Sequence, residues 1–293
     1  MVTVLTAGHV NWDVTLRVDR LPEPDGEASI RSQHQSGGGS AANVAVALAR
    51  LECSTGLIGS VGDDDNGLLA RRELEEASVS ITGVRTVENA ETAVKYLLVD
   101  DDGEVSVLGN DGVNEAIGPD DVDPEYVRPV EHVHLTSQQP ATAARIAEIA
   151  TEAGITVSFD PGRRLAERDF SETLSMADVL FATDREVEAM LVDEYPGSDF
   201  DDRIVVVKYG ADGAEAHTPD GSFVHPGFEI EAVDTTGSGD AFAAGFIATQ
   251  LRSDDIERAL EYANTCGALA ASRNGARSAP TTTEVEQFLT SRY

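Results

Sequence analysis

A short glycine-rich segment near the C-terminus has residue types that suit phosphate binding. Residues 234–240 read Asp-Thr-Thr-Gly-Ser-Gly-Asp, and the Ala-Phe-Ala-Ala-Gly-Phe that follows is typical of the start of a buried helix. The first N–H groups of a helix have no partner within it, and the helix dipole places positive charge at the same end. Because Gly237, Ser238 and Gly239 carry no bulky side chains, we expect them to form an anion hole that a phosphate can approach closely.

Asp240 places a carboxylate beside this anion hole, where it would repel a bound phosphate unless it has a chemical role. The role that fits is general base: the carboxylate takes a proton from a substrate hydroxyl while the anion hole stabilises the transferred phosphoryl group. The structural alternative is that Asp240 only caps the helix and that the glycines only form a tight turn. The motif extends over about a dozen positions, which favours the catalytic interpretation.

A second cluster of small residues, Ser36–Ala45, lies in the N-terminal part of the chain. Gly37, Gly39 and Ala42 match the GxGxxA fingerprint, so a dinucleotide-dependent oxidoreductase using Gly37–Ala42 is an alternative function. This alternative is disfavoured because residues 31–35 are polar, whereas the fingerprint requires a buried strand at that place. The sequence contains no GxxxxGK[ST] motif, so a P-loop nucleotide site is unsupported.

Short apolar runs alternate with helical patterns along the chain, which predicts an α/β fold with a central, mainly parallel sheet flanked by helices on both faces. The expected strands are Val2–Ala7, Leu57–Val61, His132–Leu135, Thr156–Phe159, Val179–Phe181 and Ile204–Val207. The expected helices are Ser40–Leu51, Asn66–Ala77, Ala141–Ala153, Arg185–Leu191, Gly239–Leu251, Asp255–Arg273 and Thr283–Ser291.

Two stretches, residues 13–36 and 91–108, follow a different pattern in which polar and apolar residues alternate with period two. They are expected to be insertions that form a small antiparallel sheet outside the main one. Such a sheet can act as a lid over a site, although surface hairpins without a role fit the same pattern. The length of 293 residues is consistent with a single domain over residues 1–293 that carries this lid.

The composition is strongly acidic, with 53 acidic and 21 basic residues and a formal net charge of −32. Self-repulsion of this size is tolerable where salt screens it, so we expect a halophilic protein that works at molar salt, where the Debye length is about 3 Å. An acidic chain without a basic face is not expected to bind nucleic acid. Isolated Cys53 and Cys266, and the lack of a long apolar run, favour a reducing cytoplasmic location without membrane contact.

The two glycine-containing motifs together, residues 38–43 and 234–240, resemble the two signatures of the PfkB family of carbohydrate kinases, the ribokinase-like group. Further matches occur in the expected order along nearly the whole chain: Gly8–Asp13, Pro22–Gly26, Gly59–Gly67, Phe159–Pro161, Lys208–Gly213 and Gly275–Pro280. This resemblance implies a ribokinase-like fold, with ATP as phosphoryl donor and Mg²⁺ as cofactor.

The resemblance also implies roles for individual residues. Asp240 matches the catalytic base, and the amides of residues 237–240 match the anion hole. Positions that hold the hydroxyls of the sugar are Asp13, Gly38, Gly39 and Asn43; positions near the nucleotide are Lys208, Gly210, Gly213, Asn264 and Gly275, the last at the start of the 275–278 stretch beside the adenine. Asp234 and Thr236 match positions that coordinate a monovalent cation, here K⁺.

One motif departs from the pattern of the family. Members usually carry Asn-x-x-Glu, which helps to organise Mg²⁺ through water, whereas this chain has Thr183-Asp184-Arg185-Glu186. Glu186 is retained and Thr183 still offers an oxygen, so metal dependence is expected to persist. With Thr183 in place of asparagine, the motif does not specify the geometry of the outer coordination shell of the metal.

Three other groups of charged or ionisable residues have two interpretations each. Lys208 follows an expected strand and is either a phosphate contact or a surface lysine; the former is favoured because Lys95 is the only other lysine. Arg163 and Arg164 either contact a phosphate of the substrate or are solvated. His132-x-His134 is more typical of one buried and one exposed residue than of a zinc site.

The function expected from these observations is ATP-dependent phosphorylation of a hydroxyl of a sugar, sugar phosphate or nucleoside, with a ribose-bearing substrate favoured. A fructokinase or phosphofructokinase-type activity is the alternative within the family. A ligand sensor on the same scaffold is disfavoured because it needs no base such as Asp240. We expect a homodimer formed through the lid. The choice of hydroxyl, and of ATP over ADP, stays open.

Overall fold

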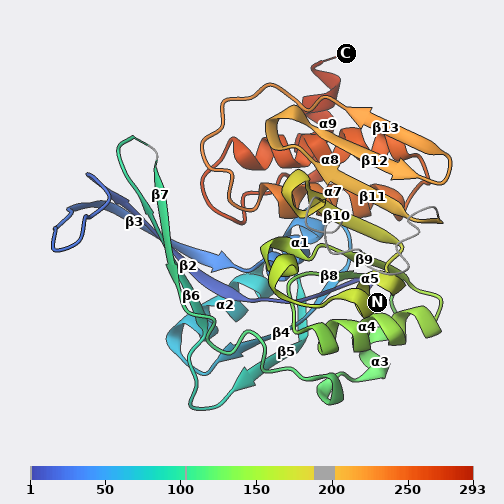
Figure 1. Ribbon diagram of the computed structural model, residues 1–293, viewed down its shortest axis with the longest axis horizontal. Helices are drawn as coiled ribbons and strands as arrows, with labels where there is room; N and C mark the ends of the chain where they lie inside the picture. Colours follow the sequence, from blue (N-terminus) through green and yellow to red (C-terminus); the bar gives the residue numbers. More distant parts are fainter. Residues whose placement is uncertain (1, 103, 188–201, 293) are drawn as a thin grey trace.

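The computed structural model describes residues 2–102, 104–187 and 202–292, and its centre is a nine-stranded sheet (Figure 1). The spatial order is β13-β12-β11-β10-β9-β8-β1-β4-β5. All neighbours from β11 to β5 are parallel, and β12 and β13 add antiparallel strands at one edge. The strands are β1 Val4–Ala7, β4 Thr55–Gly62, β5 Ser80–Val87, β8 His132–Leu135, β9 Thr156–Phe159, β10 Val179–Thr183, β11 Ile204–Lys208, β12 Ala214–Thr218 and β13 Gly221–His225.

Helices cover both faces of this sheet, which confirms the predicted fold class (Figure 1). Alternate side chains of β1 enter two different cores: Val4 packs with α1, α7 and α8, whereas Leu5 packs with α3, α4 and α5. Both are fully buried, as expected for a parallel sheet enclosed on its two faces. The α-helices are α1 Ser40–Arg50, α2 Asp65–Glu76, α3 Pro124–Val127, α4 Pro140–Glu152, α5 Ser171–Met176, α7 Ser238–Gln250, α8 Ile256–Ala271 and α9 Thr282–Thr290.

Most predicted helices match the observed ones to within one or two residues. The helix predicted over Arg185–Leu191 is helical over residues 184–187, and its remainder lies outside the described residues. Strands β5, β12 and β13 and the short helices α3 and α5 were not predicted. Within the described residues, no helix combines the length and the apolar character that a bilayer crossing requires.

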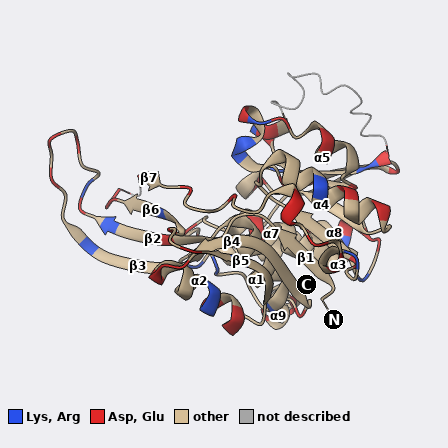
Figure 2. Ribbon diagram, turned by 90° about the horizontal axis from the view of Figure 1, so that it is seen from below, with Lys and Arg blue, Asp and Glu red and all other residues tan. Residues whose placement is uncertain are grey.

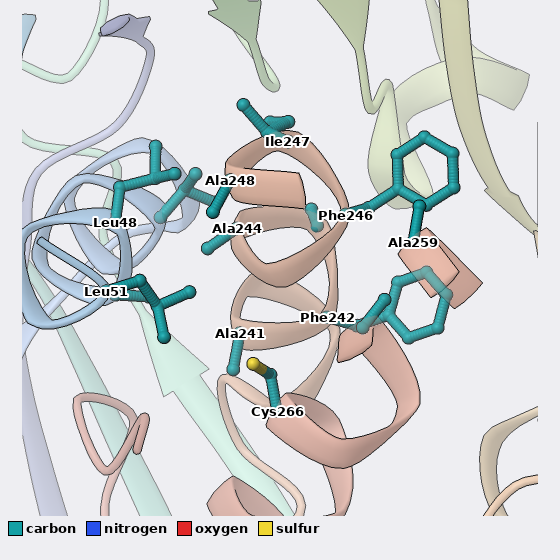
Figure 3. Close-up of a cluster of buried hydrophobic side chains, with 14 of the residues drawn as sticks. Leu48, Leu51, Ala241, Phe242, Ala244, Phe246, Ile247, Ala248, Ala259 and Cys266 are labelled. Carbon is teal, nitrogen blue, oxygen red and sulfur yellow. The ribbon is translucent and has the colours of Figure 1, made fainter. Parts of the chain in front are cut away.

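Helix α7 is buried on all sides. Its residues 241–249 are all buried, with Phe246 and Ile247 in the core beside α1 and α8 (Figure 3). Gly245 allows α8 to approach, because a Cβ atom there would lie 2.8 Å from the Sγ atom of Cys266. The core therefore fixes the position of α7, and with it the glycine-rich turn at its N-terminus.

A second, four-stranded sheet, called the small sheet below, extends from the body of the molecule (Figure 1). Its order is β3-β2-β6-β7, from strands β2 Asn11–Val18, β3 Ile30–Gly38, β6 Ala93–Val99 and β7 Val105–Gly109. The two predicted insertions supply these strands. The outer pairs are antiparallel as predicted, whereas the central pair of β2 and β6 is parallel, an arrangement that the long connection between the two insertions permits. Asp and Glu residues are spread over the helices and loops of the body (Figure 2).

Candidate active site

A cavity of about 1170 Å³ lies where the parallel strands end. Thr136 and Asp160 follow β8 and β9 directly, and Thr183 and Lys208 are the last residues of β10 and β11; all four line the cavity. β1 lies between β4 and β8, so the order in which the chain adds strands changes direction at β1. Such a switch in strand order opens a crevice at the carboxyl ends of the strands, which is the usual ligand site of an open α/β sheet.

The turn that precedes α7 forms one wall of the cavity. Gly237 has φ 76°, and a Cβ atom there would lie 2.1 Å from the carbonyl oxygen of Ala276, so only glycine fits. Gly237 and Gly239 line the cavity, whereas the Ser238 hydroxyl donates to the Thr235 carbonyl at 2.8 Å and stabilises the turn. The predicted anion hole therefore faces a cavity, as anion binding requires.

Asp240 is the third residue of α7 and lines the same cavity. Its Oδ2 atom accepts a hydrogen bond of 2.8 Å from Nδ2 of Asn43. Burial raises the pKa of Asp240 to about 6, against the hydrogen bond from Asn43 and the charge of Lys208, which lower it. A carboxylate with this pKa is ionised at neutral pH and still basic enough to take a proton, as a general base must be.

Lys208 forms an ion pair with Asp160, with 2.6 Å between Nζ and Oδ2. Burial lowers the pKa of Lys208 and the Asp160 carboxylate raises it; the net shift is upward, so the ammonium stays charged. Its Nζ atom also lies 3.8 Å from the place where a Cβ of Gly239 would be. The lysine therefore places a positive charge beside the glycine-rich turn, and its predicted phosphate contact stays a prediction.

The opposite wall presents buried polar atoms without partners. Nδ2 of Asn11, Oδ1 of Asp13 and Oδ1 of Asn43 are buried and form no hydrogen bond among the described residues. All three residues line the cavity and are less than a tenth exposed. Unpaired buried polar atoms are costly unless a ligand satisfies them. One donor and two acceptors suit a ligand with several hydroxyl groups.

The glycines of the first motif hold the backbone close to this wall. A Cβ atom on Gly38 would lie 2.1 Å from Oδ2 of Asp13, and one on Gly39 would lie 2.3 Å from the carbonyl oxygen of His9. Burial raises the pKa of Asp13 to about 6, while the charges of Lys95 and Arg277 lower it. The structure thus brings together the four residues predicted to bind the acceptor: Asp13, Gly38, Gly39 and Asn43.

The motif that replaces Asn-x-x-Glu is a capping box at the start of the helical residues 184–187. The Thr183 N–H donates to Oε2 of Glu186 at 2.8 Å, and the Glu186 N–H donates to Oγ1 of Thr183 at 3.4 Å. Threonine is a common N-cap residue in such a pair, so the replacement of asparagine keeps the local cap. Both residues line the cavity, so the cap also presents the Glu186 carboxylate to it.

Asp234 joins the two loops that lie beside the turn. Its Oδ1 atom accepts from the Thr236 N–H at 2.9 Å, and its Oδ2 atom accepts from the Gly275 N–H at 3.0 Å. Asp234, Thr236 and Gly275 all line the cavity. The carboxylate therefore fixes these loops relative to each other; its predicted role in binding a monovalent cation stays a prediction.

Three residues predicted to lie near the nucleotide do not line this cavity: Gly210, Gly213 and Asn264. Gly213 has φ 87°, and a Cβ atom there would lie 2.0 Å from the carbonyl oxygen of His225, so the β12–β13 hairpin explains the glycine. Asn264 is buried in α8 and donates to the Leu260 carbonyl at 2.8 Å. Their contribution to nucleotide binding stays a prediction.

Comparison with known proteins identifies the family. The model of the pfkB family carbohydrate kinases matches residues 1–283. The chain belongs to this family. It is 72% identical over 295 residues to an ATP-dependent ribose-1-phosphate kinase of Halopiger xanaduensis, with 100% of both chains covered. A probable chloroplastic fructokinase-6 of Arabidopsis thaliana is 33% identical, covering 86% of this chain and 74% of the relative.

The solved structures agree with this assignment. The ribokinase of Thermotoga maritima superimposes with a TM-score of 0.89 at 25% identity and covers 99% of this chain and 100% of its own. The predicted ribokinase-like fold and the predicted enzyme class, a phosphotransferase with an alcohol group as acceptor, are confirmed for this carbohydrate kinase.

The alternative oxidoreductase function is not supported, because Gly37–Ala42 does not open onto a dinucleotide site. β3 pairs antiparallel with β2 in the small sheet, outside the parallel sheet in which such a turn occurs. A Cβ atom on Gly37 would lie 2.0 Å from Nη1 of Arg277, and this guanidinium is paired with Glu73 at 2.9 Å. In this kinase the glycine therefore makes room for a buried arginine.

The two histidines of β8 differ from the expectation of one buried and one exposed residue. His132 and His134 are both buried, because β8 is central in the sheet and covered on both faces. Each forms a hydrogen bond with the Ser158 hydroxyl, at 2.7 and 2.8 Å. Burial lowers the pKa of His132 to about 3 and that of His134 to about 4, so both are neutral. No cluster of metal-ligating side chains occurs among the described residues.

Sequence reasoning missed Asn11, Glu73 and, as a buried partner of Gly37, Arg277. A signal for Asn11 exists, because it lies two residues before Asp13 and so shares its face of β2. The contact of Arg277 with residues more than 200 positions away has no local signal, since it depends on the tertiary arrangement.

The hydrogen bond between Asn43 and Asp240 gives a pH-dependence that can be measured in the kinase. Asn43→Leu removes a donor that stabilises the charged carboxylate, so the pKa of Asp240 should rise above about 6. As the predicted general base, Asp240 must be deprotonated to act, so the acid limb of the kcat profile should move to higher pH in the variant. Initial rates of both proteins across the pH range measure the shift; profiles that differ in height but share one acid limb would exclude this coupling.

Proposed function

We propose that the kinase transfers the γ-phosphoryl group of ATP to a hydroxyl of ribose 1-phosphate. The observation that carries the proposal is the pairing of two walls in one cavity. A glycine-rich helix N-terminus with the base Asp240 faces a wall with unpaired polar atoms suited to a polyhydroxylated acceptor. The relative that is 72% identical along its whole length supports ribose 1-phosphate as the acceptor.

In the proposed reaction, Asp240 accepts the proton of the attacking hydroxyl while Asn43 keeps its carboxylate in place. The hydroxyl oxygen forms a bond to the γ-phosphorus, and the bond from that phosphorus to the β,γ-bridging oxygen of ATP breaks. In this proposal the amides of residues 237–240 and the Lys208 ammonium stabilise the charge of the transferred group; Gly237, Gly239, Asp240 and Lys208 all line the cavity. ADP leaves, and the proton passes from Asp240 to solvent.

Mg²⁺ fits the chemistry of the residues present at this site. The Glu186 carboxylate lines the cavity, and carboxylate oxygens and water are the ligands that Mg²⁺ prefers. When bound, Mg²⁺ would neutralise charge on the phosphates of ATP. Asp234 and Thr236 are proposed to hold K⁺; the oxygens of Asp234 are already anchored by two backbone N–H groups, so the site would be rigid.

The small sheet is proposed to act as a lid and as a dimer contact. Asp13, Thr15 and Arg17 on one face of β2 line the cavity, so movement of the sheet would open or close it. β7 is an edge strand, and its Val107 and Leu108 are 55% and 62% exposed. An exposed apolar edge strand favours pairing with a second copy.

A panel of acceptors tests the proposed function. With ATP at molar KCl, ribose 1-phosphate should give the highest kcat/KM, ahead of ribose, nucleosides, fructose and fructose 6-phosphate. A maximum with fructose or fructose 6-phosphate would contradict the proposal and support the other activity of the family. Turnover of a nicotinamide cofactor without phosphoryl transfer would overturn the kinase mechanism itself.

The role of Glu186 is tested by Mg²⁺ titration. Glu186→Gln keeps the side-chain length and removes the charge, so half-maximal activity should need a several-fold higher Mg²⁺ concentration. Thermal melting of both proteins controls for loss of stability through the capping box. The amide oxygen of the glutamine can still accept the hydrogen bond of the box. Identical Mg²⁺ curves for the two proteins would remove Glu186 from the metal site.

Light scattering after size exclusion tests the dimer contact. The wild type should elute as a dimer at molar KCl, and Leu108→Lys should be monomeric because it places a charge on the edge strand. Leu68→Lys on α2 is the matched control, since Leu68 is 68% exposed and lies outside the small sheet. A monomeric wild type, or equal masses for both variants, would contradict the proposal.

A further inference from the structure

The cavity contains cationic side chains that form no ion pair, in a chain that has a large excess of acidic groups, although the charge of one of them, Lys95, lowers the pKa of Asp13. Arg17, Lys95 and Arg163 line the cavity, and none forms a hydrogen bond or ion pair with any residue that the structure describes. With 53 acidic against 21 basic residues, surface cations have many carboxylates to choose from. Exposed Arg258 on α8 likewise forms no side-chain hydrogen bond or ion pair with a described residue, so it is the gathering of three such cations at one cavity that points to an anionic ligand.

The charge balance of the cavity differs from that of the whole chain. Its lining includes five acidic residues (Asp13, Asp160, Glu186, Asp234 and Asp240) and five basic ones (Arg17, Lys95, Arg163, Arg164 and Lys208). The cavity is thus far richer in cations than the rest of the protein, which favours anionic ligands. Lys208 and the glycine-rich turn account for one anionic group only, the one beside Asp240.

Lys95 and Arg163 lie at the base of the small sheet. Lys95 pairs in register with Asp13 of β2 and with Gly109 of β7. Two residues beyond Gly109, Asp111 forms an ion pair of 2.6 Å with Arg164, the neighbour of Arg163. Lys95 therefore belongs to the wall that carries Asp13, and Arg163 is on the segment that the Asp111–Arg164 ion pair ties to the chain beyond β7. Arg17 is four residues along β2 from Asp13, roughly 13 Å farther out at about 3.3 Å per residue.

The two neighbouring arginines have different tasks. Arg164 is held by Asp111 and Glu115, at 2.6 and 3.0 Å. Arg168 contacts the same Glu115 at 2.6 Å. These ion pairs fix the segment that follows β9 and neutralise the charge of Arg164. The exposed guanidinium of Arg163 stays available to bind an anion. A guanidinium on a fixed segment can bind a phosphate with two parallel hydrogen bonds.

The geometry points to a second anion subsite, in which Lys95 and Arg163 bind a phosphate that the acceptor already carries. This inference rests on the proposed function and deepens it, because it explains how a phosphorylated acceptor is selected over the free sugar. With its phosphate at the base of the small sheet, ribose 1-phosphate would direct its opposite end, the primary hydroxyl, toward Asp240. The product would then carry phosphates at both ends.

Charge-neutralising variants test the subsite. Arg163→Gln and Lys95→Met should each raise the KM for ribose 1-phosphate roughly ten- to hundredfold, as expected for loss of a charge-assisted hydrogen bond, and change the KM for ATP less than twofold. The matched control is Arg258→Gln, which removes an exposed charge from α8 and should leave both constants unchanged. Arg163→Lys keeps the charge and should recover part of the affinity, which a loss of folding would not allow.

A binding measurement separates this inference from the proposed function. Calorimetry with ribose 1-phosphate in the presence of saturating ADP should show binding to the wild type and at least tenfold weaker binding to Arg163→Gln. If the wild type binds but does not phosphorylate ribose 1-phosphate, the proposed function fails and the subsite stands. Equal affinity of wild type and variant, or an effect on the KM for ATP alone, would overturn the subsite.

Discussion

The candidate active site depends on the way α7 enters the core. Nine consecutive buried residues, 241–249, fix the helix against α1 and α8, so its first turn cannot move independently of the body. The left-handed backbone of Gly237, pressed against Ala276, then sets the direction of the turn. Asp234 ties the same turn to the loop at Gly275. The orientation of the free amides and of Asp240 is therefore a consequence of core packing, and rigid donors of this kind stabilise charge without reorganisation.

Two carboxylates that line the cavity, Asp13 and Asp240, lower the stability of the fold when they are ionised. Burial raises the pKa of Asp13 and of Asp240 from 3.8 to about 6, so folding costs free energy when both are ionised. For these groups the protein is more stable in the protonated state, and that stability is lost as the pH rises from about 4 through 6. His132 and His134 act in the opposite direction: their pKa values are lowered, so their contribution is lost as the pH falls below about 6.5. Of these four groups, only Asp13 and Asp240 line the cavity. The carboxylates whose ionisation is unfavourable are therefore the ones that a substrate can contact.

The sequence was sufficient for those features that local chemistry specifies. The motif 234–240 predicted the start of α7, which the structure confirms; the anion hole and the base that it also predicted stay predictions. Period-two alternation predicted the strands of the small sheet, but the parallel pairing of β2 with β6 was missed because the two insertions were assigned antiparallel pairing throughout. The Thr183–Glu186 pair was interpreted only as part of a Mg²⁺ site, although Thr-x-x-Glu is also a local signal for a capping box.

Features that depend on distant contacts could not be predicted. Arg277 lies against Gly37 and pairs with Glu73 only after the C-terminal loop has folded over the small sheet. Arg164 is held by Asp111 and Glu115, which lie on another part of the chain, whereas its neighbour Arg163 forms no ion pair with a described residue. The fold and the enzyme class were thus accessible from the sequence because they rest on local motifs and patterns. The partners of the cavity side chains were not accessible, since they are set by tertiary packing.

The most direct test of the central claim is a comparison of wild type and Asp240→Asn by ATP binding and single-turnover phosphoryl transfer. The amide preserves shape and the helix N-terminus, so ATP affinity should be equal within a small factor. The rate of transfer should fall by about 10²- to 10⁴-fold, the range expected for loss of a general base. A variant that binds ATP equally and transfers the phosphoryl group at nearly the wild-type rate would contradict the account.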